Sequence, residues 1–551
     1  MKVPLRREWL LLGAVAVMWV VSWYLINGYA FPEEDQAIHN SYIVHAGDPT
    51  LLTRDLTVAN VVYHPSLLWP ALAFLLKLLP IEPLYLIIHA LSVFAMLLAV
   101  RWWAIGIVGD RPGARRAGLI APLLVLVSHN TLAAIPMMDH LVLPRSMMAG
   151  VLFFALGAAS RARFALAYAL CGAAFTVHAT TATHAAFLVF CISLGLRTPW
   201  KRLLLSPLWF IALASPLLLQ ILLHEKASGV PFPPPTEWVE LQRLLVEFHH
   251  IISRFDSWPV LIPLIAPLVV TIRWRMWAPL AVFAGVVAFS ATGYVLIEKL
   301  GVPIAFQLHM QEITRFLPYC GAVVVAAWFV RALDGEAHIA GPVLAGAALI
   351  TGYAEVEYAA LAWLVVERLF AEKLPFTGRA WSPRAWTLVA ATVAITAFGR
   401  WHVERPNVDI AGRDMMAWAK ANLPKDALVV IPLDWGPEMH FRHLAERAIF
   451  VSLKDGSEST FSLDATREWM RRVVALCKCD AFNVDLDVYD PRAEFIEHMQ
   501  ARYKTIDEAH LRELAREFGV THAVTRADRE LALPVLYSDA EYKIFALNRS
   551  D

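Results

Sequence analysis

The stretch Trp9-Leu-Leu-Leu-Gly-Ala-Val-Ala-Val-Met-Trp-Val-Val-Ser-Trp-Tyr-Leu-Ile26 decides the class of fold. It contains no charged residue, and a helix that crosses a bilayer needs roughly 17–25 mostly apolar residues. Basic residues precede it in Met-Lys-Val-Pro-Leu-Arg-Arg7, and no small-residue cleavage site follows it. We therefore expect a retained membrane helix with a cytoplasmic N-terminus, and not a signal peptide.

The composition of the whole chain extends this interpretation. Of the 551 residues, 58% are hydrophobic and 17% are charged, whereas soluble globular chains average about 45–50% and about 25%. The 48 basic and 48 acidic residues cancel, which excludes a chain-wide basic surface for nucleic acid. The charges are unevenly placed, because 46 of the 96 lie in residues 401–551. We expect a membrane domain over residues 1–400 and a water-exposed domain over residues 401–551.

Basic loops give the membrane domain an orientation, because Lys and Arg collect in cytoplasmic loops. The apolar piece 66–79 contains Lys77, and if it crossed the membrane, the basic loop 109–116 would face outward. We therefore expect 66–79 to be an interfacial helix inside a first external loop, residues 28–82. The expected spans are 9–27, 83–104, 118–136, 146–160, 164–179, 181–196, 203–223, 258–272, 277–297, 316–333, 338–354, 357–371 and 385–400. About thirteen spans, an odd number, place the C-terminal domain outside the cytoplasm.

The C-terminal domain alternates between strand-like and helix-like patterns. Short apolar runs rich in β-branched residues predict strands at 427–432, 448–452, 521–525 and 542–547. Helical spacing predicts helices at 415–421, 466–476 and 508–518. This alternation is typical of a small α/β domain. Five cysteines are too few for a disulfide framework, and Cys477 and Cys479 are either free thiols or a labile redox pair.

Three consecutive carboxylates, Glu33-Glu34-Asp35, follow directly on the first span. Acids beside a bilayer are costly unless they are paired, protonated or metal-bound. Clustered carboxylates raise one another's pKa and then serve as a base, or they hold a hard divalent cation. The ordinary alternative is a solvated helix N-terminus, where acidic side chains are favourable.

The order of features in this loop resembles the GT-C class of membrane glycosyltransferases. The acidic triplet is followed by a short helix, Gly47-Asp-Pro49, Arg54-Asp55, Tyr63-His-Pro-Ser66 and the interfacial helix. The resemblance implies a catalytic acidic pair at Glu34 and Asp35, with Glu33 as a shift of register. Enzymes of this class usually have Asp first, so the order Glu-Glu-Asp leaves open which carboxylate is the base.

The same resemblance implies the reaction and its partners. A sugar passes with inversion from a polyprenyl-phosphate-linked donor to a hydroxyl of a glycan, lipid or protein acceptor, at the outer face of a bacterial plasma membrane. A positioned base accelerates such an attack by about 10²–10⁴-fold. The departing lipid phosphate needs cations or a metal, Mg²⁺ or Mn²⁺, with Asp35 and Asp139 as candidate ligands.

Other expected external loops supply candidate binding residues for the substrate and its phosphate. Asp139 is the expected second carboxylate, and the spacing of His309, Glu312 and Arg315 places them near one another on a helix. Arg315, close to the bilayer edge, is a candidate phosphate ligand. The complete set of substrate candidates is Asp139, His140, Arg145, His250, Arg254, His309, Glu312 and Arg315.

Several residues and functions stay open from the sequence. His178 and His184 either line a pocket or end helices, and the segment from Phe441 to Lys454 either faces the acceptor or supports the fold. A polysaccharide polymerase or ligase is an alternative function, and it would place its catalytic groups in a late external loop. A transporter of a lipid-linked sugar is a second alternative, although the inverted repeats typical of transporters are not seen in the sequence.

Overall fold

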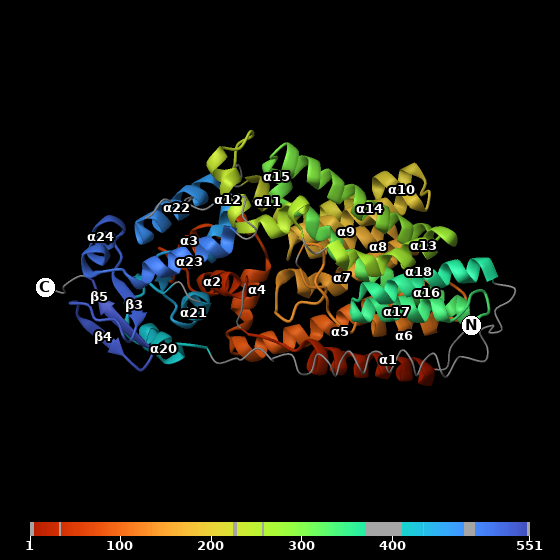
Figure 1. Cartoon of the computed structure of the whole chain (residues 1–551), viewed down its shortest axis with the longest axis horizontal. Coiled ribbons are helices and arrows are strands. Elements are labelled where there is room, and N and C mark those ends of the chain that lie inside the picture. The colour runs from red at the N-terminus through yellow and green to blue at the C-terminus, as the bar shows by residue number, and fades with distance from the viewer. Residues whose placement is uncertain are drawn as a thin grey trace.

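The computed structural model describes residues 5–31, 35–133, 135–223, 229–255, 258–370, 410–432, 435–478 and 491–547. These residues form an elongated molecule that is mostly helical, with a small sheet at one end (Figure 1). Five helical stretches of this part are long and apolar enough to cross a membrane. They are Glu8–Asn27, Ile81–Val108, Trp200–Leu223, Trp277–Lys299 and Pro303–Leu333.

Further helices are apolar but shorter. Four of them, Phe164–Phe175, Ala179–Gly195, Trp258–Arg273 and Ala340–Thr351, each have between 10 and 17 residues. The multi-pass architecture expected from the sequence is therefore present, but the count of about thirteen spans is not confirmed. The expected span 385–400 lies outside the described residues.

The expected span 118–136 is wrong. Helix α6 (Ala114–Leu124) contains Pro122 and ends two residues later, and the chain then continues irregularly to α7 (Pro144–Ser160). A carbonyl freed in this irregular stretch is paired by the first helical stretch, because Ser22 Oγ and Asn27 Nδ2 donate to Leu126 O at 2.8 and 2.7 Å. Irregular backbone inside an apolar bundle is tolerated where protein groups satisfy it.

Close packing holds the bundle together. Helix α5 (Ile81–Val108) lies against α7, and small residues allow the approach, because a Cβ added to Gly150 would lie 2.9 Å from the backbone of Ala95. The other helices of this part are α1 (Leu5–Val20), η1 (Val21–Asn27), α8 (Phe164–Phe175), α9 (Ala179–Gly195), α10 (Trp200–Leu205), α11 (Leu208–Leu223), α12 (Thr236–His250), η3 (Ile252–Arg254), η4 (Trp258–Leu264), α13 (Ile265–Arg273), α14 (Trp277–Tyr294), η5 (Val295–Lys299), α15 (Pro303–Gln307), η6 (Met310–Arg315), α16 (Phe316–Leu333), α17 (Ala340–Thr351) and α18 (Ala354–Phe370).

The first loop, which we define as residues 28–31 and 35–80, is built from short helices. They are α2 (Asp35–Gly47), α3 (Leu56–Ala59), η2 (Val61–Tyr63) and α4 (Leu68–Leu75). Helix α4 is the expected interfacial helix, although it is shorter than 66–79. Its apolar residues pack on α2 in a cluster that includes Tyr42 and Trp69, so the loop has a small core of its own.

The C-terminal residues form a five-stranded sheet in the order β2-β1-β3-β5-β4. Strands β1 (Leu428–Val430), β2 (Ala448–Ile449) and β3 (His522–Arg526) are parallel, while β4 (Val535–Ser538) and β5 (Tyr542–Ala546) complete an antiparallel edge. Helices α20 (Arg413–Asn422), α21 (Trp435–Leu444), η7 (Lys454–Thr460), α22 (Leu463–Cys477), α23 (Pro491–Lys504) and α24 (Glu508–Phe518) accompany it.

Four of the five strands and three of these helices were expected from the sequence. Strand β4 was not predicted, although it lies in the apolar run Leu531-Ala-Leu-Pro-Val-Leu-Tyr537, and it is largely exposed at the edge of the sheet. Cys477 is disulfide-bonded, which corrects the free-thiol alternative for this residue. Cys479 lies outside the described residues.

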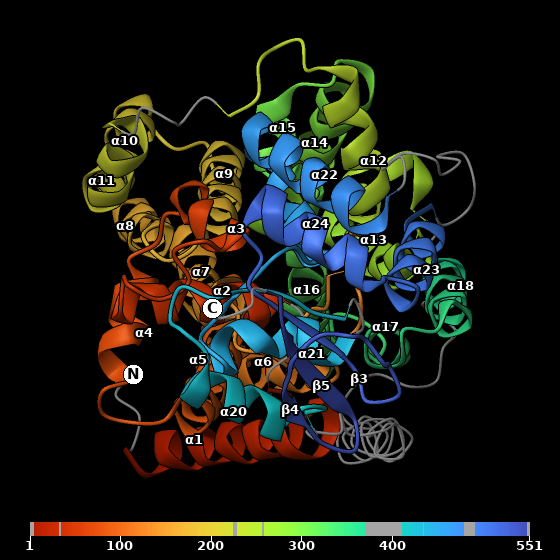
Figure 2. The same ribbon diagram turned by 90° about the vertical axis from the view of Figure 1, so that its left-hand side faces the viewer.

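The sheet end is attached to the first loop through buried charges. Arg442 donates to Asp55 at 2.8 Å and to Asp455 at 2.7 Å, and none of the three side chains is more than 3% exposed. At the rim, Arg54 donates to the carbonyls of Phe518 and Gly519. Figure 2 looks onto this end, with the C-terminal helices and strands facing the viewer. The attachment fixes η7 against the first loop.

Candidate functional site

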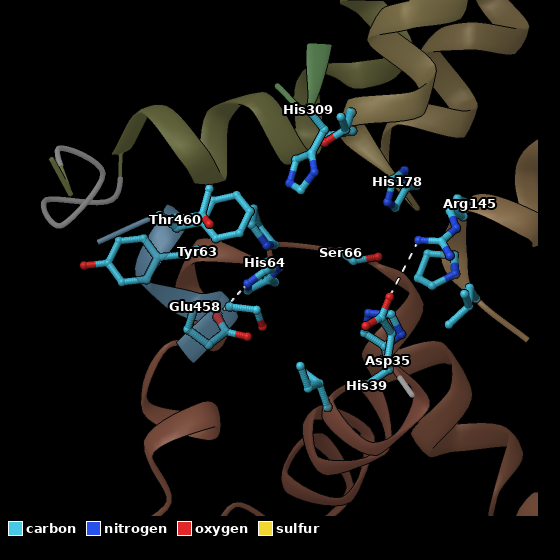
Figure 3. Close-up of a pocket in the computed structure, with 18 of the residues that line it drawn as sticks. Asp35, His39, Tyr63, His64, Ser66, Arg145, His178, His309, Glu458 and Thr460 are labelled. Atoms are coloured by element: carbon cyan, nitrogen blue, oxygen red, sulfur yellow. Dashed lines mark hydrogen bonds and ion pairs between the residues drawn. The ribbon is translucent and has the colours of Figure 1, made fainter. Parts of the chain in front are cut away.

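A cavity of about 240 Å³ lies where the first loop, the helical bundle and η7 meet. Its walls combine residues far apart in the sequence, from Asp35 on α2 to Phe461 after η7 (Figure 3). The charged and histidine side chains that line it are Asp35, His39, His64, Arg145, His178, His309, Glu312, Lys454 and Glu458. This density of titratable groups in a cleft is typical of a functional site.

Asp35 is the first residue of α2, where a carboxylate is favourable for the helix dipole. Its Oδ1 lies 2.6 Å from Lys454 Nζ, and its Oδ2 lies 3.6 Å from Arg145 Nη1. Burial alone would raise the pKa of Asp35, but the charges of Lys454 and Arg145 outweigh it and hold this pKa far below its usual range. Asp35 is therefore ionised and held between two cations.

A second carboxylate stands behind Arg145. Asp139 is buried, and its Oδ1 lies 3.0 Å from Arg145 Nη2. Its Oδ2 lies 3.6 Å from Arg315 Nη2. The two arginines and the two aspartates thus form a chain in which Arg145 bridges Asp35 and Asp139. Asp139 and Arg315 face a smaller neighbouring cavity and not the main one.

The opposite side of the cavity contains a histidine held by a buried glutamate (Figure 3). His64 Nε2 lies 2.6 Å from Glu458 Oε2, and Tyr42 donates its hydroxyl to Glu458 Oε1 at 2.9 Å. The Glu458 side chain is 2% exposed and that of His64 is 25% exposed. Glu458 therefore contacts His64 through Nε2, and Nδ1 is the other ring nitrogen.

Two further histidines of the cavity are neutral. Burial is the main cause that lowers the pKa of His39 to about 3, and burial likewise lowers the pKa of His178 to about 3. His178 caps the N-terminus of α9, accepting from the backbone of Thr181. Its Nδ1 is therefore unprotonated, which agrees with a neutral ring.

His309 lies at the top of the cavity in Figure 3, and Glu312 also lines the cavity. The expected proximity of these two residues is confirmed, because His309 Nδ1 lies 3.0 Å from Glu312 Oε1. Glu312 lies in the 3₁₀ helix η6, and His309 directly precedes this helix with a left-handed backbone, φ 45°. His250 is buried behind them, with its ring centroid 4.8 Å from that of His309.

The remaining expected substrate residues are not brought to the cavity. His140, His250, Arg254 and Arg315 do not line it, and the carbonyl of His140 instead accepts from the backbone of Ala30. Glu33 and Glu34 lie outside the described residues. Of the expected site residues, the cavity contains Asp35, Arg145, His309 and Glu312, with Asp139 one contact away.

Sequence reasoning missed His39, His64, Lys454 and Glu458 as members of one site. Lys454 and Glu458 lie on η7, more than 400 residues from Asp35 along the chain. A weak signal was available, because Lys454 follows the apolar run at β2 in a segment that the sequence left open between substrate contact and structural support. In that segment Arg442 is paired with buried acids and Lys454 lines the cavity.

The described side chains that could coordinate a divalent metal are poorly placed to do so. Among the described residues, no group of three or more His, Cys, Asp or Glu side chains is placed to hold a metal ion. The two expected ligands, Asp35 and Asp139, are each ion-paired with Arg145. A guanidinium between two carboxylates supplies the positive charge that a bridging metal would otherwise bring.

Sequence comparisons identify one family and no named relative. Residues 411–476, which contain β1, β2 and η7, match a family described as a domain of unknown function (DUF6798). No curated protein matches the sequence.

Solved structures with a similar arrangement include two transferase-related membrane proteins. ArnT from Cupriavidus metallidurans bound to undecaprenyl phosphate has a TM-score of 0.45 at 14% identity, covering 100% of this chain and 99% of that one. The archaeal oligosaccharyltransferase AglB from Archaeoglobus fulgidus, in complex with an inhibitory peptide and a dolichol-phosphate, has a TM-score of 0.40 at 10% identity, covering 95% and 70%. Because both TM-scores lie below 0.5, we take the function from the geometry of the cavity.

Proposed function

We propose that the protein is a membrane glycosyltransferase that moves a sugar from a polyprenyl-phosphate carrier to a hydroxyl acceptor. One observation carries the proposal. Lys454 and Arg145 converge on the Asp35 carboxylate inside a cavity at the end of an apolar helical bundle. A cation pair beside a carboxylate is what transfer from a lipid phosphate requires.

The chemistry follows from competition for the two cations. A lipid phosphate that enters the cavity competes with Asp35 for Lys454 and Arg145. As a sugar diester it carries one negative charge, like the carboxylate, and as the departing monoester it carries up to two. Asp35 is then released from its ion pairs and its pKa rises towards the ordinary value. The released carboxylate accepts the proton of the acceptor hydroxyl as that oxygen attacks the anomeric carbon, and the carbon–oxygen bond to the phosphate breaks with inversion. The lipid phosphate departs as an anion paired with the two cations.

Donor binding in this scheme needs no metal. Arg145 stays anchored by Asp139 at 3.0 Å while it contacts the phosphate, so its position is set before the donor arrives. Lys454 is placed on η7 by the buried contacts of the neighbouring Asp455. The glycan, lipid or protein nature of the acceptor, the plasma-membrane location and the outward orientation of residues 401–551 remain part of the proposal.

The proposal is tested with the full chain in lipid nanodiscs, using undecaprenyl phosphate as the binding probe and a panel of undecaprenyl-phosphate sugars as donors. We expect Lys454→Ala to weaken binding of the lipid phosphate by about 10-fold or more, because one charge-assisted contact is lost. We expect Asp35→Asn to lower turnover by about 10²–10⁴-fold while lipid-phosphate binding is kept or strengthened, because a competing anion is removed.

Asp48→Asn is the matched control. Asp48 also lies in the first loop and pairs with a lysine of the C-terminal part, Lys425 at 3.0 Å, but it is exposed and outside the cavity. It should leave binding and turnover unchanged. Full turnover in Asp35→Asn, or unaltered lipid-phosphate binding in Lys454→Ala, would contradict the proposal. A transporter would move lipid-linked sugar in both variants without transferring it.

A further inference from the structure

A second cavity, of about 580 Å³, lies in the C-terminal part, away from the cavity that contains Asp35. Its described lining is Pro432, Gln500, Tyr503, Lys504, Thr525, Arg526, Asp528 and Arg529. Cavities of about 300–1,000 Å³ are typical of sites for small molecules. None of these residues belongs to the proposed transferase site, so the cavity needs its own explanation.

The topology of the sheet places this cavity where the connections after two neighbouring parallel strands diverge. Strands β1 and β3 are parallel neighbours, and the chain leaves them in opposite directions, from β1 to β2 on one side and from β3 to β4 and β5 on the other. The carboxyl ends of two such strands leave a crevice between their diverging connections, and open α/β sheets bind ligands there. Pro432 follows β1 and Thr525 is near the end of β3, so the cavity occupies that crevice.

Three cations and one acid give the cavity a positive charge. Arg529 donates to the carbonyl of Ile506 at 2.5 Å, which fixes the guanidinium by a neutral acceptor. Arg526 donates to the hydroxyl of Tyr542 at 2.8 Å and lies over its ring. The Arg529 guanidinium is oriented in advance by its contact with Ile506, and it keeps its charge available for an anion.

Lys504 and Arg529 differ from most cations nearby. Several basic side chains of the described C-terminal part pair with acids, as in Arg472 with Glu468, Lys478 with Glu513 and Arg512 with Glu508. Within the described residues, no carboxylate lies within 4.0 Å of the Lys504 or Arg529 charge. Two cations without an acidic partner, at the mouth of a crevice, indicate that the compensating anion comes from a ligand.

The position of the sheet indicates which source of anion fits. In Figure 1 the strands lie at the opposite end of the molecule from α16, α17 and α18. An anion reaching the carboxyl ends of β1 and β3 therefore comes from water and not from the bilayer that the apolar helices would occupy. The cavity is also large enough for more than a single phosphate group.

We propose that the crevice at the carboxyl ends of β1 and β3 binds a soluble molecule with a phosphate or pyrophosphate group. Lys504 and Arg529 contact the anion, and Arg526 with the hydroxyl of Thr525 completes its surroundings. This site is separate from the one in which Asp35 lies, and it does not depend on the transferase function.

The test uses the full chain in nanodiscs with a Lys454→Ala background, which removes a cation of the first cavity. Calorimetric titration with inorganic pyrophosphate, and separately with inorganic phosphate, should show saturable binding at constant ionic strength. Lys504→Gln should weaken the binding of pyrophosphate by several-fold, and Lys504→Gln with Arg529→Gln should weaken it by about 10-fold or more. Lys504 is exposed, so its single substitution leaves the fold intact.

A matched control removes two charges elsewhere in the same part of the chain. Arg471→Gln with Arg512→Gln alters two exposed ion pairs on α22 and α24 and should leave pyrophosphate binding unchanged. An equal loss in this control would show that only diffuse charge attracts the anion, and the proposal would fail. It would also fail if the Lys454→Ala protein showed no saturable binding, or if undecaprenyl phosphate displaced the bound pyrophosphate.

Discussion

Replacing Arg442 with glutamine tests how the C-terminal part builds the cavity. Arg442 donates to Asp55 Oδ2 at 2.8 Å and to both oxygens of Asp455 at 2.7 and 2.8 Å. The group of three carries one net negative charge, and without the guanidinium two carboxylates, each 0% exposed, would remain. Removing one partner of a buried ion pair costs about 3–5 kcal/mol. This energy shifts the equilibrium between the docked and undocked C-terminal part by about 10²–10⁴-fold.

The consequence reaches the cavity because Asp455 is next to Lys454. We expect Arg442→Gln to lower the melting temperature and to weaken undecaprenyl-phosphate binding about 10-fold or more, as Lys454 loses its fixed position. Arg442→Lys should recover part of the melting temperature and part of the binding affinity. The matched control is Arg467→Gln, since Arg467 joins the C-terminal part to Glu237 on α12 through an exposed pair, and such pairs contribute about 0–1 kcal/mol.

The pH dependence of the defect gives a separate readout. Burial is the largest cause that raises the pKa of Asp55 above its ordinary value, and losing Arg442 would raise it further. A carboxyl with a raised pKa in the folded state adds stability at acidic pH, and loses this contribution as pH rises through the folded value. The defect of Arg442→Gln should therefore shrink towards pH 4 and grow towards pH 8, as followed by melting temperature. A lowered melting temperature with unchanged lipid-phosphate affinity would refute the positioning role of Arg442.

Three further outcomes follow from the site. Glu458→Gln should lower turnover by about 10-fold or more while lipid-phosphate binding stays unchanged, since it loosens His64 without contacting the cations. The control Glu541→Gln, on an exposed turn, should leave both turnover and binding unchanged. Burial lowers the pKa of His39 and of His443 to about 3, so each disfavours the folded state as pH falls below about 6.5. The melting temperature should therefore fall between pH 7 and pH 5, and less steeply in His443→Gln; an unchanged slope would contradict the burial argument. EDTA should leave the affinity for undecaprenyl phosphate unchanged, and a loss that Mg²⁺ or Mn²⁺ restores would show that a metal completes the donor site.

Apolar runs were sufficient to predict the helical bundle and most of the sheet. Strands β1, β2, β3 and β5 were predicted because each has a buried apolar run. The span expected at 118–136 failed because hydropathy counts apolar side chains but does not show where carbonyls find donors. Here Ser22 and Asn27, from a distant helix, pair with the backbone at Leu126 and make a non-helical path possible.

In the candidate site, too, residues with a local sequence signal were predicted, and residues placed by long-range contacts were not. Asp35 was singled out because three acids beside a membrane span are unusual, and Arg145 because it ends a polar loop before a helix. Lys454 and Glu458 carry no such local mark, since a Lys and a Glu on a polar turn are ordinary. Their importance comes from the contacts of Arg442 with Asp55 and Asp455, which bring η7 to the first loop and are not encoded by any short stretch of sequence.

The shared walls of the main cavity have a consequence for the order of assembly. Its residues come from positions 35–69 in the first loop, from the helical bundle, and from positions 453–461 near the other end of the chain. Until the later segment has been synthesised and docked, the earlier one presents Asp35 and His64 without Lys454 or Glu458. A nascent or truncated chain therefore has an incomplete site, and the proposed sugar transfer must wait until the later segment is in place.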